Sequence, residues 1–171
     1  MRKINKIDFL LIFMDIKIRK AVEDDVKIIL EFNQELFDYE YENFDKTLDC
    51  QWPPNNKNYF KNSINKDNSV ALVAVDGKKV VGYLVGCLAE SEDYRKISKI
   101  AEIDNMFVIS EYRNKGVGSF LCEEFFNWVR SKGIRRAKVI VSAKNESAIA
   151  FYKKCGFSDY NYIFELDVSL K

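Results

Sequence analysis

The sequence predicts one domain of mixed α/β class, in which strands and helices do not alternate regularly. Segments with alternating or continuous apolar residues indicate strands, and apolar residues at helical spacing indicate helices. The first four predicted strands form a meander with helices inserted after the first, and two strand–helix alternations follow. A doubly wound sheet would alternate throughout, so this order favours the mixed class.

The first elements have simple local signals. Ile16 and Ile18 alternate with polar residues, as in a half-buried strand. A helix is expected from Ala21, with acidic residues in its first turn, where the helix dipole favours them. A second helix is expected over residues 55–64, after the chain is interrupted by two prolines.

A hairpin and two strand–helix units complete the domain. Asp76-Gly77 is a typical hairpin turn between predicted strands at 70–75 and 80–88. The later elements are a strand at 100–109, a helix at 117–132 ended by Gly133, a strand at 137–142, a short helix capped by Asn145 and strand material at 160–170.

The composition excludes several classes of catalytic site. The chain has 171 residues, of which 47% are apolar and 31% charged, as expected for one globular domain. It contains no histidine, which excludes serine–histidine triads, cysteine–histidine dyads and histidine-ligated metals. No metal is expected. The cysteines lack CxxC spacing and are expected to be reduced thiols in a cytoplasmic protein. They lie at positions 50, 87, 122 and 155.

Residues 1–13 are expected to be an extension outside the domain, which would cover residues 14–171. The apolar run from Phe9 to Met14 is too short to span a bilayer, and no small-residue cleavage site follows it. From Met14 the sequence continues as an ordinary first strand. No membrane association is expected, and a net charge of +1 gives no general attraction to nucleic acid.

The most informative stretch is a glycine-containing loop between a strand and a helix. It reads Arg113-Asn114-Lys115-Gly116-Val117-Gly118 and follows the apolar run from Met106 to Ile109. Glycines let a backbone approach a ligand closely, and the first helical turn directs free N–H groups at an anion. The loop therefore predicts a pyrophosphate site, with an ordinary glycine turn as the alternative. The P-loop pattern is absent, and Leu121 stands where the Rossmann fingerprint needs a third glycine.

A second motif lies on the short helix near residue 150. It consists of Asn145, Ala148, Tyr152, Gly156 and Phe157, and the first three share one helical face. Alone, this pattern favours a capped amphipathic helix with Tyr152 at the edge of the core, because aromatic residues at such positions are usually packing residues.

The order and separation of these two motifs resemble the core of the GNAT superfamily, the acyl-CoA-dependent N-acyltransferases. The resemblance is strong over residues 100–157 and weak over 14–36, and residues 37–68 match nothing specific. Ser110 stands where many members carry proline. The resemblance implies a mostly antiparallel sheet of six to seven strands, flanked by about four helices, with a V-shaped opening between the fourth and fifth strands.

The resemblance also implies acetyl-CoA as co-substrate. Its pantetheine arm is expected in the opening, its pyrophosphate on the glycine loop and its thioester sulfur near Tyr152. The implied contact residues are Met106, Phe107, Val108, Arg113, Asn114, Lys115, Gly116, Val117, Gly118, Ser119, Asn145, Ser147 and Tyr152.

Transfer of an acyl group from a thioester to an amine needs a base, an oxyanion donor and an acid. Without histidine, carboxylates and tyrosine are the candidates. Glu102 and Asp104 lie two apart on the central strand, hence on one face. Glu102 matches the base of several GNAT enzymes, and Asp104, closer to the reacting end, is its rival. As an alternative, either carboxylate serves only to bind a cationic substrate. Water is the third candidate for the base. The Met106 N–H is the candidate oxyanion donor and Tyr152 the candidate acid.

The expected activity is N-acetylation of a primary amine by direct attack, and the acceptor is expected to be a small cationic molecule. Residues 37–49 combine five acids with four aromatic residues, which suits a cation, although a solvated acidic loop is the alternative. A protein or peptide N-acetyltransferase and a non-catalytic acyl-CoA-binding module are the alternative functions, and a homodimer is left open. A nucleic-acid binder is disfavoured, because the basic stretch 130–138 lacks interleaved aromatic residues.

Overall fold

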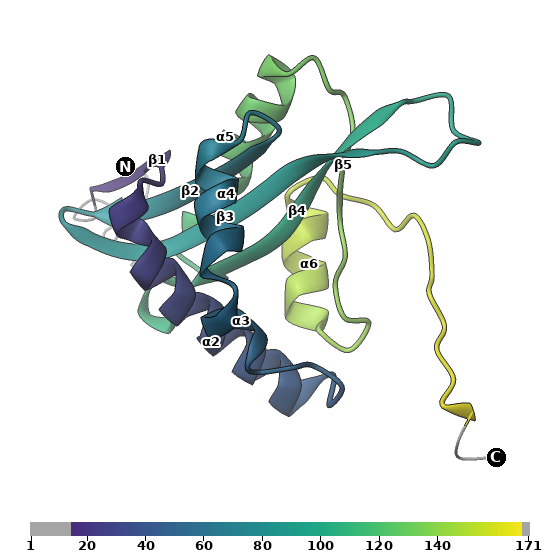
Figure 1. The fold of residues 1–171 in the computed structure, drawn as a ribbon, viewed down its shortest axis with the longest axis horizontal. Coiled ribbons are helices and arrows are strands. Elements are labelled where there is room, and N and C mark those ends of the chain that lie inside the picture. The colour runs from purple at the N-terminus through teal and green to yellow at the C-terminus, as the bar shows by residue number, and fades with distance from the viewer. Residues whose placement is uncertain (1–14, 169–171) are drawn as a thin grey trace, which may run out of the picture.

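The computed structural model describes residues 15–168, which form a sheet with helices on both faces (Figure 1). Neighbouring strands are antiparallel from β1 to β4, and β5 runs parallel to β4. The mixed, mostly antiparallel sheet expected from the sequence is therefore confirmed. The strands lie in sequence order: β1 Ile16–Lys20, β2 Ser69–Asp76, β3 Lys79–Glu90, β4 Lys99–Val108 and β5 Ala137–Val139.

Five α-helices and two short 3₁₀-helices accompany these strands within the described part of the chain, and α6 follows the last strand. Gly133, with φ of +72°, follows the long helix α5, and the Asn145 side chain accepts the N–H of Ala148 at 3.0 Å to cap α6. The helices are η1 Glu23–Asp25, α2 Val26–Asn43, α3 Trp52–Asn55, α4 Lys57–Asn65, η2 Ser110–Tyr112, α5 Val117–Ser131 and α6 Glu146–Lys154.

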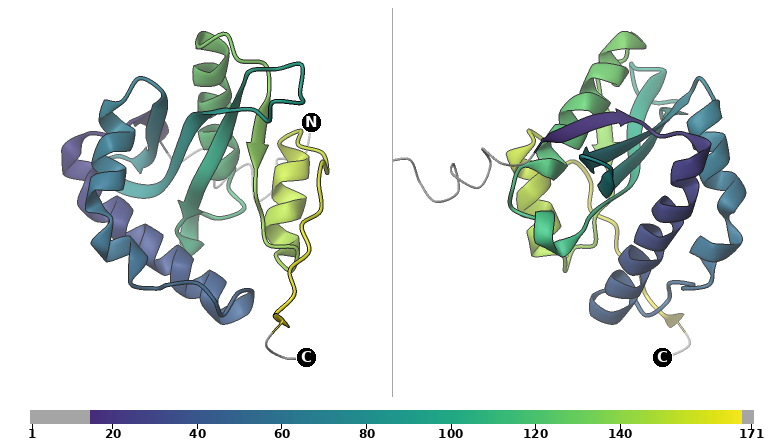
Figure 2. Two further views of the ribbon diagram at one scale, coloured as in Figure 1. Left: turned by 45° about the vertical axis from the view of Figure 1, so that its right-hand side comes forward. Right: turned by 90° about the vertical axis from the view of Figure 1, so that its left-hand side faces the viewer.

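The helices bury two separate apolar clusters on opposite faces of the sheet. On one face, α2 and α4 pack against the sheet, and the cluster there includes Phe60 of α4 and Tyr83 of β3. On the other face, α5 and α6 pack against the sheet, and the cluster there includes Leu121 and Phe125 of α5. The two views of Figure 2 show the sheet between these two pairs of helices. Burying one large apolar side chain contributes roughly 1.5–3 kcal/mol. The central strands are therefore held from both sides, and β4 contributes to both clusters.

The expectation of six to seven strands is wrong for residues 15–168, because the last segment does not join the sheet. Residues 160–168 form no strand and extend away from it (Figure 1). Tyr162, Ile163 and Phe164 are 79%, 76% and 93% exposed. The fifth strand is also shorter than the predicted 137–142, since it ends at Val139. A three-residue edge strand offers few backbone groups to a further strand.

The acidic segment 37–49 is partly helical, because α2 continues to Asn43. The proline pair does not simply interrupt the chain: Pro53 and Pro54 stand in the first turn of α3, where a missing N–H costs nothing. The predicted extension 1–13 lies outside the described residues, so the boundary at Met14 stays a prediction. No helix within residues 15–168 is long and apolar enough to cross a membrane.

Candidate active site

The strands β4 and β5 part along their length, where the opening was expected. Their ladder covers only three residues, from Ala101 opposite Ala137 to Ile103 opposite Val139. β4 continues to Val108, and no other described strand pairs with residues 104–108 on that side. The backbone N–H and C=O groups on this edge are therefore available to an extended ligand such as a pantetheine arm.

A bulge in β4 lies where the two strands part. The consecutive residues Val85 and Gly86 of β3 pair with Asn105 and Ile103, so Asp104 is the extra residue of β4. Asp104 is exposed to solvent. Its carboxylate accepts a hydrogen bond from the Tyr59 hydroxyl at 2.8 Å and one from the Cys87 thiol at 3.4 Å. The bulge thus presents the Asp104 carboxylate on the face of the sheet that α4 covers, in the stretch of β4 that does not pair with β5.

The two candidate carboxylates have different partners. Glu102 forms an ion pair with Lys138, its neighbour across the β4–β5 ladder, with 3.1 Å between Oε2 and Nζ. Asp104 has no cationic partner within 4 Å among the described residues. Burial against its neighbours raises the pKa of the Asp104 carboxyl above its ordinary value, although the hydrogen bonds from Tyr59 and Cys87 oppose this shift. The two carboxylates therefore differ in their partners: Glu102 is paired with a cation, and Asp104 accepts hydrogen bonds from Tyr59 and Cys87.

Tyr59 is a site residue that the sequence did not reveal. Its hydroxyl also accepts the Asn105 side-chain N–H at 3.4 Å, so it links Asp104 to the next residue of β4. The ring is held by an edge contact with Trp52 at 5.5 Å between centroids. Tyr59 belongs to α4, 45 residues before Asp104, in a segment without any motif. In the sequence, only the spacing of the aromatic residues on that helix could have pointed to Tyr59.

Tyr152 lies on α6 between two other aromatic rings. Its ring centroid is 5.1 Å from that of Phe151 and 5.7 Å from that of Phe157. Burial raises the pKa of its hydroxyl, and the nearby Cys122, Cys155 and Glu40 add to this shift. The raised pKa keeps the hydroxyl protonated near neutral pH, and it makes no hydrogen bond with another residue of 15–168.

The glycine loop has the backbone geometry of an anion site. Gly116 has φ of +83° and stands before α5, and Asn114 has φ of +59°. The N–H of Phe120 bonds the Gly116 carbonyl at 3.0 Å, while the N–H groups of residues 117–119 have no partner in the described part of the chain. Three free amides at the start of a helix, without acidic residues in its first turn, favour an anion.

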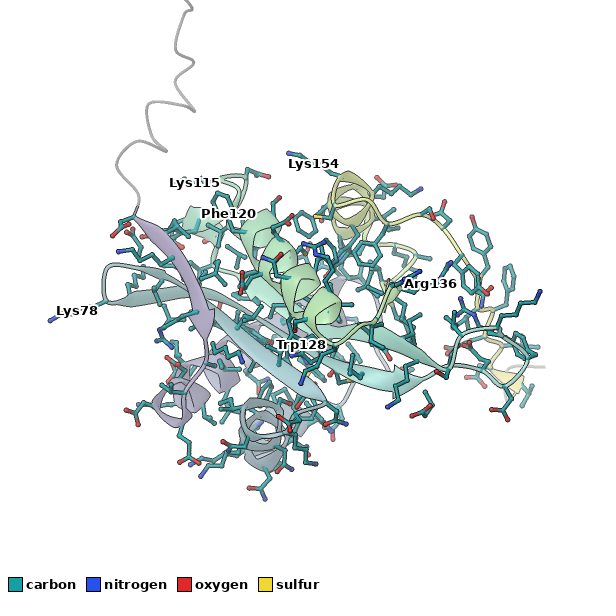
Figure 3. The ribbon with its side chains drawn as sticks, turned by 90° about the horizontal axis from the view of Figure 1, so that it is seen from above. Lys78, Lys115, Phe120, Trp128, Arg136 and Lys154 are labelled. Carbon is teal, nitrogen blue, oxygen red and sulfur yellow. The ribbon has the colours of Figure 1, made fainter. Side chains whose placement is uncertain are left out.

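The side chains of this loop are placed less simply than expected. Arg113 donates its Nε–H to the Val108 carbonyl at 2.8 Å, so it stabilises the end of β4 as well as adding charge. Lys115 precedes α5, and its ammonium lies 5.5 Å from the centroid of the Tyr112 ring; Figure 3 labels Lys115 and the exposed Phe120 of α5. Gly118 serves packing, because a Cβ there would lie 3.1 Å from the Phe151 ring of α6.

Asn145 and Ser147 form a small polar group at the start of α6. Asn145 is buried, and its Oδ1 accepts both the Ala148 N–H at 3.0 Å and the Ser147 hydroxyl at 2.9 Å. Because these bonds occupy the oxygen, the amide Nδ2 is the group that remains for a ligand. The capping role is confirmed, and the ligand role stays a prediction.

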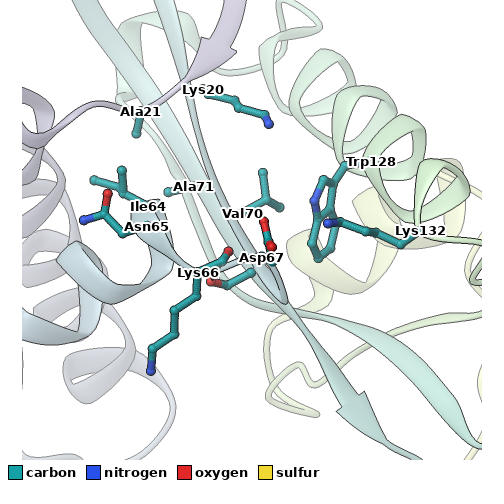
Figure 4. A pocket seen from close by; sticks show the side chains of 11 residues that line it. Lys20, Ala21, Ile64, Asn65, Lys66, Asp67, Val70, Ala71, Trp128 and Lys132 are labelled. Atoms are coloured by element: carbon teal, nitrogen blue, oxygen red, sulfur yellow. Dashed lines mark hydrogen bonds between the residues drawn. The ribbon is translucent and has the colours of Figure 1, made fainter.

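A separate hollow lies at the other end of the sheet. Figure 4 shows it between the end of α4, the start of β2 and Trp128 of α5. It has a volume of about 130 Å³ and a rim that includes Lys20, Lys66 and Lys132. It contains none of the predicted site residues. No group of three or more potential metal ligands lies together within residues 15–168, and the four cysteines are free thiols.

The parted β4–β5 edge, the anion loop before α5 and the proton-carrying groups beside them define the class of acyl-CoA-dependent N-acyltransferases. A comparison with known families agrees, since a model of the acetyltransferase (GNAT) family matches residues 31–157. The chain belongs to that family.

A relative of known family and two solved structures of similar fold accompany this match. An uncharacterized N-acetyltransferase from Methanocaldococcus jannaschii is 29% identical over 144 residues, which cover 83% of this chain and 60% of that relative. The chain thus spans less than two thirds of this relative. A tetramutant of the BH1408 protein from Bacillus halodurans has a similar fold, with a TM-score of 0.79, 21% identity and coverage of 89% and 99% of the two chains. An aminoglycoside 6′-N-acetyltransferase from Acinetobacter baumannii has a TM-score of 0.70 at 15% identity, covering 89% and 97%.

Proposed function

We propose that the protein transfers the acetyl group of acetyl-CoA directly to a primary amine of a small cationic molecule, with Asp104 as base and Tyr152 as acid. The observation that carries the proposal is the bulge in β4, which sets a solvent-exposed carboxylate beside the unpaired edge of that strand. A thioester lying along this edge would be within reach of an amine that contacts Asp104. The neighbour that is named an aminoglycoside acetyltransferase agrees with an amine acceptor in this fold.

The proposed reaction moves two protons. The amine nitrogen bonds the acetyl carbon, and the bond between that carbon and the CoA sulfur breaks. The proton lost by the nitrogen goes to Asp104, directly or through water, and the leaving sulfur takes the proton of the Tyr152 hydroxyl. Acetyl-CoA supplies the thioester, and the free amides of residues 117–119 would hold its pyrophosphate.

Asp104 is preferred to Glu102 because of what each carboxylate contacts. Glu102 is engaged in an ion pair with Lys138, whereas Asp104 has no cationic partner within 4 Å among residues 15–168. Asp104 has a raised pKa, which brings it closer to that of an effective base near neutral pH. Tyr59 would be a positioning residue, since its hydroxyl holds Asp104 Oδ2 while the Cys87 thiol contacts Oδ1.

The test compares Asp104→Asn with Glu102→Gln, using release of free thiol from acetyl-CoA with a panel of amines. Loss of general base catalysis typically costs about 10²–10⁴-fold. We expect that loss in kcat for Asp104→Asn, together with loss of the limb on which the rate rises with pH. Glu102→Gln should keep that limb, and calorimetry should show unchanged acetyl-CoA affinity in both. A pH limb that disappears in Glu102→Gln and persists in Asp104→Asn would assign the base to Glu102.

A further inference from the structure

A cysteine of β3 lies against the proposed base. The Cys87 thiol is 3.4 Å from Oδ1 of Asp104, and the Tyr59 hydroxyl is 2.8 Å from Oδ2. A deprotonated carboxylate can only accept hydrogen bonds, so the thiol and the hydroxyl are the donors. Each oxygen of Asp104 is therefore held by one donor, and the two donors come from different elements, β3 and α4.

The bulge in β4 makes the contact with Cys87 possible. In the β3–β4 ladder, the residue opposite Cys87 is Glu102. Asp104 is the extra residue of the bulge and has no partner of its own in that ladder, and its carboxylate reaches the thiol that stands opposite Glu102. Glu102 itself pairs with Lys138. The thiol therefore binds the one of the two carboxylates that has no cationic partner within 4 Å among residues 15–168.

The surroundings of Cys87 keep its thiol protonated. Burial raises the pKa of this half-buried thiol to about 12, and the charges of Asp104 and Glu102 add to the shift. A cysteine acts as a nucleophile only as the thiolate. Near neutral pH Cys87 is therefore a hydrogen-bond donor, and it is unsuited to attack the thioester and carry the acetyl group itself.

We propose that Cys87 is a positioning residue for the acetyl transfer: its thiol holds Oδ1 of Asp104, and it forms no acetyl-cysteine. The inference rests on the proposed function, in which Asp104 takes the proton of the amine. With one donor on each oxygen, the carboxylate group cannot rotate freely, so the lone pairs that remain for the amine keep a fixed direction.

The groups that face Asp104 determine the pH at which it takes a proton. They are Tyr59 of α4, Cys87 of β3, Glu102 of β4 and Lys138 of β5. Burial is the largest effect and raises the pKa of Asp104, and the charge of Glu102 adds to it. The hydrogen bonds from Tyr59 and Cys87 lower this pKa, as does the charge of Lys138. Removing the thiol donor therefore raises the pKa of Asp104, and the base stays protonated up to a higher pH.

The first experiment compares Cys87→Ala, which removes the donor, with Cys87→Ser, which keeps an O–H donor at the same position. Cys50→Ala is the matched control, because Cys50 is a half-buried thiol outside the sheet, in the turn before α3. Release of free thiol from acetyl-CoA with the amine panel is measured against pH. We expect kcat to fall about tenfold in Cys87→Ala, as for the loss of one hydrogen bond to a charged group. The limb on which the rate rises with pH should move to higher pH in Cys87→Ala and keep its wild-type position in Cys87→Ser and Cys50→Ala.

The second experiment detects the contact without any acetyl transfer. Iodoacetamide alkylates thiolates, and mass spectrometry of the digested protein gives separate rates for Cys87 and Cys50. Loss of the Asp104 charge lowers the pKa of the Cys87 thiol. Asp104→Asn should therefore increase the alkylation rate of Cys87 and leave the rate of Cys50 unchanged.

Three results would overturn the inference. They are a pH limb that keeps its wild-type position in Cys87→Ala, an alkylation rate of Cys87 that is unchanged in Asp104→Asn, and an acetyl group found on Cys87 after the protein is mixed with acetyl-CoA alone. The alkylation rates also separate this inference from the proposed function. Faster alkylation of Cys87 in Asp104→Asn, in a wild-type protein that releases no thiol with any amine, would support the hydrogen bond and refute the acetyl transfer.

Discussion

Replacing Gly86 by alanine tests whether the bulge that presents Asp104 depends on close packing over β3. A Cβ at this position would lie 2.5 Å from Cε2 of Phe125 and 2.6 Å from the backbone oxygen of Glu102. Phe125 is fully buried, and the Glu102 oxygen belongs to β4, so neither can move without shifting α5 or the sheet. Overpacking a core typically costs about 1–3 kcal/mol, and two such contacts place the expected cost near the upper end of that range.

The cost is measured by thermal unfolding against a matched control. About 3 kcal/mol corresponds to a decrease in Tm of about 6–12 °C for a chain of this size. Gly77→Ala is the control: it stands in the hairpin turn with φ of +58°, and a Cβ added there would meet no atom within 4 Å. Its left-handed strain should cost about 1–2 kcal/mol. We also expect Gly86→Ala to lower kcat, because Ile103 and Asp104 shift with the bulge. A Gly86→Ala protein that melts as high as Gly77→Ala would refute the packing argument.

Three further changes test other parts of the structure. Gly116→Asp places a negative charge at the anion loop and should abolish acetyl-CoA binding in calorimetry, whereas unchanged affinity would remove the loop from the site. Tyr152→Phe should lower the rate of the chemical step by about 10²–10⁴-fold, and a folded variant with wild-type single-turnover kinetics would exclude its role as acid. Asp25→Asn should cost about 2 kcal/mol in urea unfolding, because the buried Asp25 accepts both guanidinium nitrogens of Arg19, at 2.6 and 2.8 Å. The bond from Arg19 lowers the pKa of Asp25, so its contribution is present above the ordinary value of 3.8 and is lost as pH falls below it; Asp25→Asn should lack that acid-dependent loss.

The parts of the site that the sequence predicted are those set by local chemistry. The αL glycine before α5 and the Asn145 cap of α6 depend on residues within a few positions of one another, so a motif is enough to find them. The resemblance then placed Tyr152 and the two carboxylates. The choice between Glu102 and Asp104 needed the partners Lys138 and Tyr59, which come from other strands and helices and leave no mark in the local sequence.

The final segment shows the limit of pattern reading for strands. Residues 160–168 have the alternation of apolar and polar side chains that predicts a strand. Pairing also needs an edge with enough free backbone groups, and the three-residue β5 provides few of them. In the same way, the acidic residues near Phe37 looked equivalent in the sequence. In the structure, Glu40 is half-buried on α2, Asp38 and Glu42 are exposed on the same helix, and Asp45 and Asp49 follow it in the chain.

The two apolar clusters on opposite faces of the sheet divide the candidate site into two layers, and each layer can accept substitutions separately from the other. The loop for acetyl-CoA and Tyr152 belong to the layer of α5 and α6, while Tyr59 belongs to the layer of α2 and α4. Among the described residues, the central sheet and Ile109, which directly follows β4, contact both clusters. Substitutions that alter the shape of one layer can therefore accumulate without disturbing the packing of the other, so a new acceptor preference can evolve on α2–α4 while the donor half keeps its function.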